Sequence, residues 1–257
     1  MKNRKRIAVV PAKGESMRVP GKNMEPLYGH PMFLYSVWYA MNEGFDPVVS
    51  SDSEEILECA RYFGARTFTE NVDDSDIANC VRQVLEDGDN GSCELFALLQ
   101  PTSPLRQPGL LREMADTVSS GRGDASCAFT ATGVKLLGSM VHVYREGVEP
   151  VPNKFYMAYR DQDADRKFMA FNGNILVCLK SAFDKSGNLF NNGDGALVYN
   201  STAETCTTLQ VDYPGDMALV EGAMCRPEFH DYNPANNLPE EYRQRYLWTI
   251  RGTTIHT

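Results

Sequence analysis

Residues 6–23 read RIAVVPAKGESMRVPGKN, an apolar run followed at once by a charged loop. The run from Ile7 to Val10 predicts a short buried strand, because a continuous apolar segment that ends at a turn is typical of the centre of a parallel sheet. The loop then places three cations, Lys13, Arg18 and Lys22, around Gly14. A tight glycine turn can aim backbone N–H groups at an anion, and the cations add full positive charges. The stretch therefore predicts an anion site, suited to a triphosphate, where the first strand ends.

Two familiar phosphate-binding patterns are absent from this loop. The dinucleotide fingerprint needs GxGxxG and the P-loop needs GxxxxGK[ST], and residues 11–23 contain neither. A solvated basic loop that binds nothing is the alternative interpretation. The position of the loop directly after a buried strand favours a binding loop, since open α/β sheets bind ligands at the carboxyl ends of their strands.

Strand and helix signals alternate along most of the chain. Strands are expected at 6–12, 46–51, 95–99, 125–130, 174–179 and 208–211. Helices are expected at 31–44, 52–63, 75–87, 109–119, after Pro214 and at 238–247. The alternation predicts an α/β fold with a mostly parallel sheet and helices on both faces. Residues 1–257 are expected to form a single domain, within which 133–170 is an excursion that serves as a lid or a dimer arm.

Three loops that follow predicted strands carry unusual chemistry. They are the loop at 11–23, the segment SSDSEE at 50–55 and the segment QPTSPLR at 100–106. In the third loop two prolines fix the backbone, and four side chains can donate hydrogen bonds to a carboxylate, a hydroxyl or a nucleotide: Gln100, Thr102, Ser103 and Arg106. Because these loops are expected at one edge of the sheet, we predict that they share a site.

Composition limits the classes of partner and compartment. The net charge of -9 argues against a general affinity for nucleic acid. No apolar run approaches the length of a membrane span, and the basic start is followed by too short an apolar run for a signal peptide. The 7 cysteines are widely spaced without a CxxC pair, which is typical of reduced thiols. We therefore expect a cytoplasmic protein without nucleic-acid or membrane partners.

Several motifs together resemble one enzyme family. The loop pattern Ala12-x-Gly14-x-Ser16-x-Arg18, continued by Pro20, Lys22 and Asn23, resembles the signature of nucleotidyltransferases that activate sugars and sugar acids. More narrowly, residues 11–37 resemble the start of the acylneuraminate cytidylyltransferases, the CMP-sialic acid synthetase family. Further segments match in the same order, namely VVSSDSEEI at 48–56, LLQPTSPLR at 98–106, FNGNILV at 171–177 and LQVDYPGDMALVE at 209–221. The resemblance covers about residues 6–224.

The resemblance implies a Rossmann-like, GT-A-like nucleotidyltransferase fold. It implies that the enzyme uses Mg²⁺ and transfers CMP from CTP to a hydroxyl of a sialic-acid-like nonulosonate, with release of pyrophosphate. It also implies a homodimer formed through the excursion at 133–170. Such a transfer needs charge neutralisation on the phosphates more than a protein nucleophile, which agrees with the cations of the first loop.

Residue roles follow from the positions that match the family. Lys13, Arg18 and Lys22 are implied to bind the triphosphate, and the rest of the nucleotide site comprises Ala12, Gly14, Ser16, Asn23 and Asp76. Asp212 is implied to hold the metal, with Asp216 either joining through water or capping the next helix. Gln100 and the Asn172–Gly173 pair are implied to face the acceptor, although an Asn-Gly pair alone is a common turn.

The chain departs from the family at four places. Relatives carry a lysine at Met17, an arginine near the base at Glu70 and an aspartate at Gln210, and an arginine that meets the acceptor carboxylate stands near residues 170–171. These differences leave other activities open: another base, an acceptor of the 3-deoxy-octulosonate type or a phosphonate, or a catalytically silent relative that only binds a nucleotide.

Overall fold

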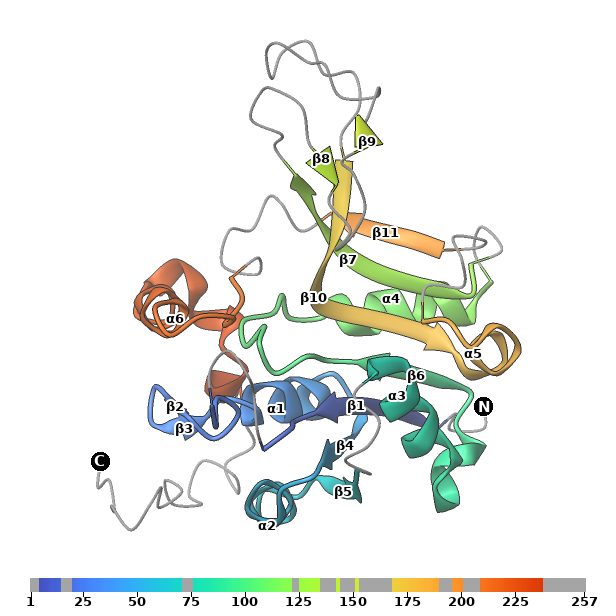
Figure 1. Cartoon of the computed structure of the whole chain (residues 1–257), viewed down its shortest axis with the longest axis horizontal. Coiled ribbons are helices and arrows are strands. Elements are labelled where there is room, and N and C mark those ends of the chain that lie inside the picture. Colours follow the sequence, from blue (N-terminus) through green and yellow to red (C-terminus); the bar gives the residue numbers. More distant parts are fainter. Residues whose placement is uncertain are drawn as a thin grey trace.

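The computed structural model describes residues 5–14, 20–70, 76–121, 125–134, 142–143, 151–152, 168–189, 196–200 and 209–237. The strands of the main sheet are β1 (Arg6–Pro11), β4 (Asp46–Ser51), β5 (Arg66–Thr69), β6 (Leu95–Leu98), β7 (Cys127–Val134), β10 (Phe168–Leu179) and β11 (Ala196–Asn200) (Figure 1). Two short hairpins pair β2 (Pro26–Leu27) with β3 (His30–Pro31), and β8 (His142–Val143) with β9 (Val151–Pro152). The α-helices are α1 (Leu34–Asn42), α2 (Glu54–Tyr62), α3 (Ile77–Glu86), α4 (Leu110–Ser119), α5 (Lys180–Ser186) and α6 (Asp216–Met224). Short 3-10 helices lie at η1 (Gly88–Ser92), η6 (Pro227–Tyr232) and η7 (Pro234–Asn237).

The main sheet has 7 strands in the order β11-β7-β10-β6-β1-β4-β5. β1 pairs in parallel with β4 on one side and β6 on the other, and β4 pairs in parallel with β5. β10 runs antiparallel to both of its neighbours, while β11 is parallel to β7. The predicted mostly parallel α/β sheet is therefore confirmed. Its strand order reverses between β1 and β6, and open α/β sheets bind ligands at such a point.

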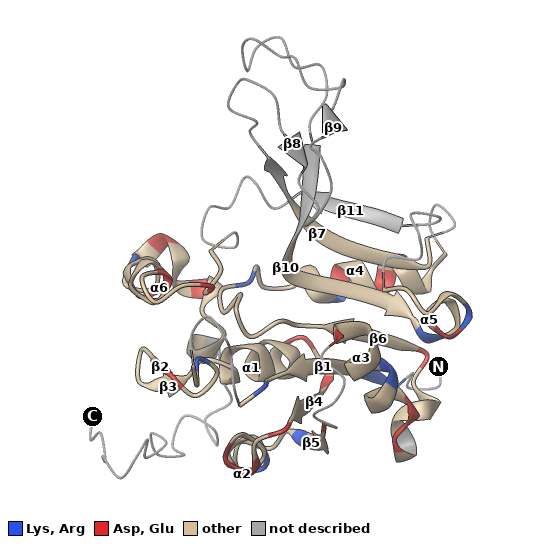
Figure 2. Cartoon of the chain, in the orientation of Figure 1, with Lys and Arg blue, Asp and Glu red and all other residues tan. Residues whose placement is uncertain are grey.

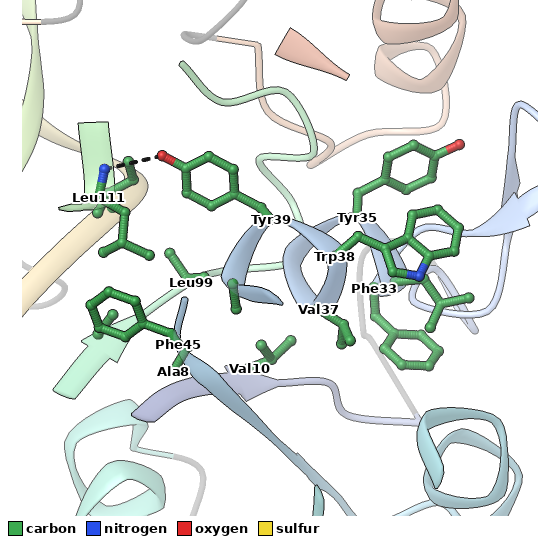
Figure 3. Packing of buried hydrophobic residues seen from close by; sticks show 14 of the residues in the cluster. Ala8, Val10, Phe33, Tyr35, Val37, Trp38, Tyr39, Phe45, Leu99 and Leu111 are labelled. Atoms are coloured by element: carbon green, nitrogen blue, oxygen red, sulfur yellow. Dashed lines mark hydrogen bonds between the residues drawn. The ribbon is translucent and has the colours of Figure 1, made fainter. Parts of the chain in front are cut away.

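Helices cover both faces of this sheet. On β1, Ala8 and Val10 belong to one buried cluster, which contains the α1 aromatics, while Ile7 and Val9 belong to a second cluster, which contains Phe183 of α5. This alternation follows from the two-residue period of a strand. Figure 3 shows the first cluster, with the side chains of α1 packed over β1. The prediction of helices on both faces is confirmed.

Some predicted boundaries are wrong. Pro31 lies in β3, and the predicted helix begins only at Leu34. Residues 209–211 were expected to complete a strand, but they lie outside any strand, and the Val211 N–H donates to the Thr102 carbonyl at 2.8 Å instead. The strands β5 and β11 and the helix α5 have no counterpart among the predicted elements. The helix expected at 238–247 lies outside the described residues.

The ends of the predicted excursion at 133–170 belong to the main sheet. β7 continues to Val134 and β10 begins at Phe168, and these two residues are partners in the antiparallel ladder. Between them the structure describes the small β8–β9 hairpin, which Figure 1 shows beyond the ends of β7 and β10. The excursion is therefore shorter than predicted at both ends. Its role as a dimer arm stays a prediction.

No helix within the described part of the chain combines the length and the apolar character that a membrane span requires.

Candidate active site

Acidic and basic residues are interspersed over the described elements (Figure 2). Charged and amide side chains nevertheless meet at the carboxyl ends of the parallel strands, on both sides of the point where the strand order reverses. This is where the sequence predicted a shared site.

The turn after β1 is fixed by the end of β4. The Ala12 N–H donates to the Ser50 carbonyl at 2.8 Å, and the Gly14 N–H donates to the Asp52 carboxylate at 2.7 Å. A side chain at Gly14 would place its Cβ 2.7 Å from the Cβ of Ser53, so the close approach of the two loops requires glycine there. In this structure Asp52 accepts the Gly14 N–H, and the predicted role of Gly14 in nucleotide binding stays a prediction. Ser16 and Arg18 lie outside the described residues.

Lys13 pairs with a buried acid. Its Nζ lies 3.6 Å from Oε1 of Glu70, whose side chain is only 1% exposed, while that of Lys13 is 34% exposed. Glu70 directly follows β5, and its N–H donates to the Ser51 carbonyl at the end of β4. The Lys13 carbonyl accepts from Nδ2 of Asn23 at 2.8 Å. The predicted role of Asn23 in nucleotide binding stays a prediction, and its observed contact holds the loop of Lys13.

A thiol lies close to this pair. Sγ of Cys80, on α3, donates to Oγ of Ser50 at 3.3 Å. Burial raises the pKa of the Cys80 thiol to about 11, so the thiol stays protonated at neutral pH. Cys80 therefore adds no charge next to Lys13.

Lys22 contacts the loop that carries the predicted metal ligand. Its Nζ lies 3.8 Å from Oδ1 of Asp212 and 3.4 Å from the carbonyl oxygen of Val211. The Asp216 carboxylate accepts the N–H groups of Asp212 and Tyr213 through one oxygen, at 2.8 Å each, and Asp216 is the first residue of α6. Asp216 therefore positions Asp212 by holding this turn, and its role at a metal stays a prediction.

Arg106 has a different place from the predicted one. Its side chain is fully buried, and it donates to the carbonyl oxygens of Gln100 at 2.8 Å and Asn174 at 3.0 Å. Burial lowers the pKa of the Arg106 guanidinium to about 9, which still leaves it charged at neutral pH. The prediction that Arg106 donates to a ligand is therefore replaced by a positioning role, because its donors hold the loop after β6 against β10.

Two other members of the QPTSPLR loop differ in burial, since Ser103 is buried and Thr102 is half-buried. Ser103 is fully buried, which removes its hydroxyl from the surface that a ligand could reach. Thr102 accepts the Val211 N–H with its backbone carbonyl and so joins the loop after β6 to the loop of Asp212. Gln100 of this loop lies next to Gly173, and the predicted contact of Thr102 with a ligand stays a prediction.

The Asn172–Gly173 pair lies within β10 and supports Gln100. Oδ1 of Asn172 accepts from Oγ1 of Thr130 at 2.7 Å and from the Asn174 N–H at 3.2 Å. Gly173 has a φ of +71°, and a Cβ built there would lie 2.5 Å from Oε1 of Gln100 and 2.8 Å from Nε2 of Gln210. Gln100 and Gln210 thus meet over the bare backbone of Gly173. The contact of Gln210 was missed by sequence reasoning, which treated that residue only as a departure from the family.

Replacing Gly173 with alanine should lower kcat/KM by on the order of 100-fold while costing only about 1–2 kcal/mol of unfolding free energy. The added Cβ displaces the Gln100 amide, and the left-handed backbone is strained for alanine. Steady-state rates and urea unfolding check this expectation. Gly121→Ala is the matched control, because Gly121 has a φ of +67° with open space around its Cβ position. Equal effects of the two variants on rate would contradict the role of Gly173.

Asp76 begins a helix. Its Oδ1 accepts the Ala78 N–H at 3.3 Å as the N-cap of α3. Its predicted contact with a nucleotide stays a prediction.

The site residues form a row that follows the strand order. Ion pairs join Glu70 to Lys13 and Lys22 to Asp212, and a hydrogen bond joins Asn23 to Lys13. The hydrogen bond from the Val211 N–H to the Thr102 carbonyl joins the loop of Asp212 to the loop of Gln100. From the end of β5, past β1 and β6, to β10, the row is Glu70, Lys13, Asn23, Lys22, Asp212, Thr102, Gln100 and Gly173. Glu70 thus lies at the β5 end, Lys13 and Lys22 lie in the middle together with Asn23 and Asp212, and the Gln100 amide lies at the β10 end.

The donor set fits a magnesium ion that the substrate helps to hold. Among the described residues no group of 3 or more His, Cys, Asp or Glu side chains is arranged to bind a metal. Asp212 instead offers a carboxylate that is 30% exposed beside Lys22. Mg²⁺ commonly binds through one or two carboxylates, waters and substrate phosphates, so a single aspartate suits it.

An α/β sheet with cations and a partly exposed carboxylate at its switch point is suited to bind a nucleotide for phosphoryl or nucleotidyl transfer. Residues 7–165 match the family model described as Cytidylyltransferase. Because this match spans more than half of the chain, the chain belongs to the cytidylyltransferase family.

Curated relatives act on sugar acids. The chain is 25% identical over 227 residues to a CMP-N,N'-diacetyllegionaminic acid synthase of Legionella pneumophila, covering 85% of this chain and 95% of that protein. Over 64 residues it is 47% identical to a pseudaminic acid cytidylyltransferase of Campylobacter jejuni, covering 24% and 28% of the two chains. It is also 29% identical over 118 residues to a 3-deoxy-manno-octulosonate cytidylyltransferase of Synechococcus elongatus, covering 45% and 47%.

Solved structures confirm the fold. A CMP:2-keto-3-deoxy-manno-octonic acid synthetase, solved with CTP, superposes with a TM-score of 0.62 at 14% identity and covers 86% of this chain and 98% of that one. A 4-diphosphocytidyl-2C-methyl-D-erythritol synthase of Anaerococcus prevotii superposes with a TM-score of 0.58 at 12% identity, covering 87% and 99%. The predicted nucleotidyltransferase fold is thus confirmed.

Proposed function

We propose that this protein transfers CMP from CTP to a hydroxyl of a sialic-acid-like nonulosonate and releases pyrophosphate. The observation that carries the proposal is the row of site residues, in which the Lys22–Asp212 pair lies between the Lys13 loop and the Gln100–Gly173 contact. That arrangement suits a triphosphate in the middle and a sugar acid at the amide end. The nearly full-length similarity to the legionaminic acid synthase supports an acceptor of the nonulosonate class.

The chemistry requires little covalent participation from the protein. The acceptor oxygen bonds to the α-phosphorus, the bond from that phosphorus to the bridging oxygen of the pyrophosphate breaks, and the hydroxyl proton is lost. Lys13 and Lys22 neutralise phosphate oxygens in the nucleotide and in the leaving pyrophosphate. Mg²⁺, held by Asp212 and the phosphates, would supply further neutralisation of this charge. Gln100 donates to and accepts from the acceptor, because its amide carries both kinds of group.

The assembly and compartment are part of the proposal. The homodimer and its interface at the 133–170 excursion rest on the family resemblance. A cytoplasmic location is supported by the thiols: all 6 cysteines within the described residues are free.

Pyrophosphate release tests the proposal directly. The protein is incubated with Mg²⁺, one of CTP, UTP, GTP or ATP, and one of a panel of nonulosonic acids, 3-deoxy-octulosonate and phosphonates. We expect release with CTP and a nonulosonic acid, and none when the acceptor is omitted. Release only with 3-deoxy-octulosonate would instead support the second candidate acceptor, which the 29% identical relative favours. Nucleotide binding without release from any combination would contradict both.

A further inference from the structure

Two side-chain amides meet at the β10 end of the site, and the proposed reaction uses only one of them. A Cβ built on Gly173 would lie 2.5 Å from Oε1 of Gln100 and 2.8 Å from Nε2 of Gln210. A side chain at residue 173 would displace both amides, so the glycine is what lets them approach the backbone of β10. Gln100 follows β6, and Gln210 precedes α6. The fold therefore brings two glutamines from distant parts of the chain to one place.

These two glutamines, called the amide pair below, are not satisfied by the protein. Within the part of the chain that the structure describes, no hydrogen bond joins the side chain of Gln100 or Gln210 to another residue. Five described residues have a buried side-chain nitrogen or oxygen without a partner, and neither glutamine is one of them. Both glutamines are half-buried. Their amide atoms therefore remain open to solvent or to a ligand.

The amide pair presents opposite hydrogen-bonding ends. The oxygen of the Gln100 amide and the nitrogen of the Gln210 amide are the atoms turned toward Gly173. The amine of Gln100 and the oxygen of Gln210 therefore point away from that glycine. An amide nitrogen donates hydrogen bonds, whereas an amide oxygen accepts them. The open side of the pair thus offers one donor and one acceptor, and neither is charged.

This combination fits an amide on the ligand better than an acid or a hydroxyl. A carboxylate or a phosphate only accepts, so it would face the Gln210 oxygen without a hydrogen to donate. A hydroxyl donates and accepts from a single oxygen, which reaches two separate groups less well. The C=O and N–H of an N-acyl group stand on adjacent atoms, so they can accept from Gln100 and donate to Gln210 at the same time. The amide pair therefore suits an acylamido substituent.

We infer that Gln210, together with Gln100, binds an N-acyl group of the acceptor and makes the enzyme prefer acylamido sugar acids to sugar acids with a hydroxyl in that position. The inference rests on the proposed function, since it assumes that a sugar acid binds at the β10 end. Gln210 stands two residues before Asp212, and the Cα atoms of residues two apart are at most about 7 Å from each other. A sugar ring with its substituents spans such a distance, so one acceptor can reach both the phosphate beside Asp212 and the amide pair.

A purely structural role for Gln210 makes a different prediction. If Gln210 only packed beside Gln100, its loss would slow the reaction with every acceptor alike, because the disturbed Gln100 serves them all. If Gln210 binds the N-acyl group, its loss slows the reaction with N-acylated acceptors and spares those with a hydroxyl in that position. The ratio of kcat/KM for the two kinds of acceptor therefore separates the roles.

The experiment measures pyrophosphate release from CTP and Mg²⁺ with acceptors that differ only in this group. The acceptors are N-acetylneuraminate, N,N'-diacetyllegionaminate and the counterpart of each that carries hydroxyls in place of the acetamido groups. In the wild-type protein, kcat/KM for the better N-acylated acceptor should exceed that for its counterpart by about 10- to 100-fold, the value of two neutral hydrogen bonds. In Gln210→Met, which keeps the length of the side chain without an amide, this ratio should fall by about 5-fold.

Gln107→Met is the matched control. Gln107 is exposed and directly follows the buried Arg106, so this variant loses a glutamine amide from the same loop as Gln100 but outside the amide pair. It should keep both the wild-type rate and the wild-type ratio. The comparison of acceptors in the wild-type protein needs no variant, so the inference stays testable even if Gln210→Met does not fold.

Two results would overturn the inference while leaving the proposed function intact. One is a kcat/KM of the wild-type protein for the hydroxyl counterpart that equals or exceeds the value for the N-acylated acceptor. The other is an unchanged ratio in a folded Gln210→Met variant. If no acceptor supports pyrophosphate release from CTP in the wild-type protein, the proposed function fails, and the inference fails with it.

Discussion

Asp212→Asn should lower the rate of pyrophosphate release with CTP and acceptor by on the order of 100- to 1,000-fold. The change keeps the shape of the side chain but removes the negative charge beside Lys22, whose Nζ lies 3.8 Å from the carboxylate. An amide oxygen is a weaker ligand for a hard cation such as Mg²⁺ than a carboxylate. Turnover measured over a range of Mg²⁺ concentrations checks this, and the half-saturating Mg²⁺ concentration should rise.

Asp116→Asn is the matched control for this prediction. Asp116 pairs with Arg6 at 2.6 Å, and Arg6 is at the amino end of β1, away from the carboxyl ends where the site lies. The control removes one carboxylate from one ion pair and should leave the rate within about 2-fold, since exposed pairs contribute little. A rate for Asp212→Asn within 3-fold of the wild type, with about the same Mg²⁺ requirement, would show that Asp212 does not hold the metal.

The first half of the sheet could be predicted from sequence because its strands are continuous apolar runs. Ile7 to Val10 and Leu95 to Leu98 are buried on both faces, and each ends at a loop with turn-forming residues. The fold places these loops at one edge of the sheet, as parallel strands require. The hydrogen bond from the Gly14 N–H to Asp52 shows that two of them touch.

The antiparallel part of the sheet was harder to predict. β10 runs for 12 residues, and Asn172, Gly173 and Asn174 interrupt it at the point where its register with β7 shifts. Polar residues inside a strand obscure the apolar pattern from which a strand is predicted. The sequence therefore predicts a strand that begins only at Asn174. Residues 209–211 show the opposite error. Their pattern suggests a strand, but tertiary contacts with Thr102 determine their path.

Within the site, residue types were predicted better than their roles. The structure brings Lys22 to Asp212, and the contact of Val211 with Thr102 joins the loop of Asp212 to the loop of Gln100. The sequence could not show that Arg106 turns inward, since arginine is mostly exposed and a loop arginine suggests a ligand contact. Nor could it pair Lys13 with Glu70, because that contact joins β1 to β5 across β4.

The inward-turned guanidinium leads to the largest expected effect on stability. Arg106→Ala should lower the free energy of unfolding by about 3–5 kcal/mol, because it leaves a cavity and removes the donors to the buried carbonyls of Gln100 and Asn174. The guanidinium also lies 5.5 Å from the ring centre of Tyr39, a further contact that alanine loses. Burying the charged guanidinium, which lowers the Arg106 pKa, costs free energy that the alanine variant does not lose. The variant still leaves the two carbonyls without their donors and without contact with water. Urea unfolding gives the difference.

Arg61→Ala is the control for this change. Arg61 is 48% exposed and pairs with Glu54 on the surface of α2 at 2.6 Å, so its loss should cost less than about 1 kcal/mol. The Arg106→Ala variant should also turn over its substrates more slowly under conditions where it is still folded. The reason is that the Gln100 carbonyl is no longer held next to β10. A stability loss no greater than that of the control would mean that rearrangement or water replaces the two donors. In that case the loop after β6 would be held by its prolines and by the contact of Thr102 with Val211, rather than by Arg106.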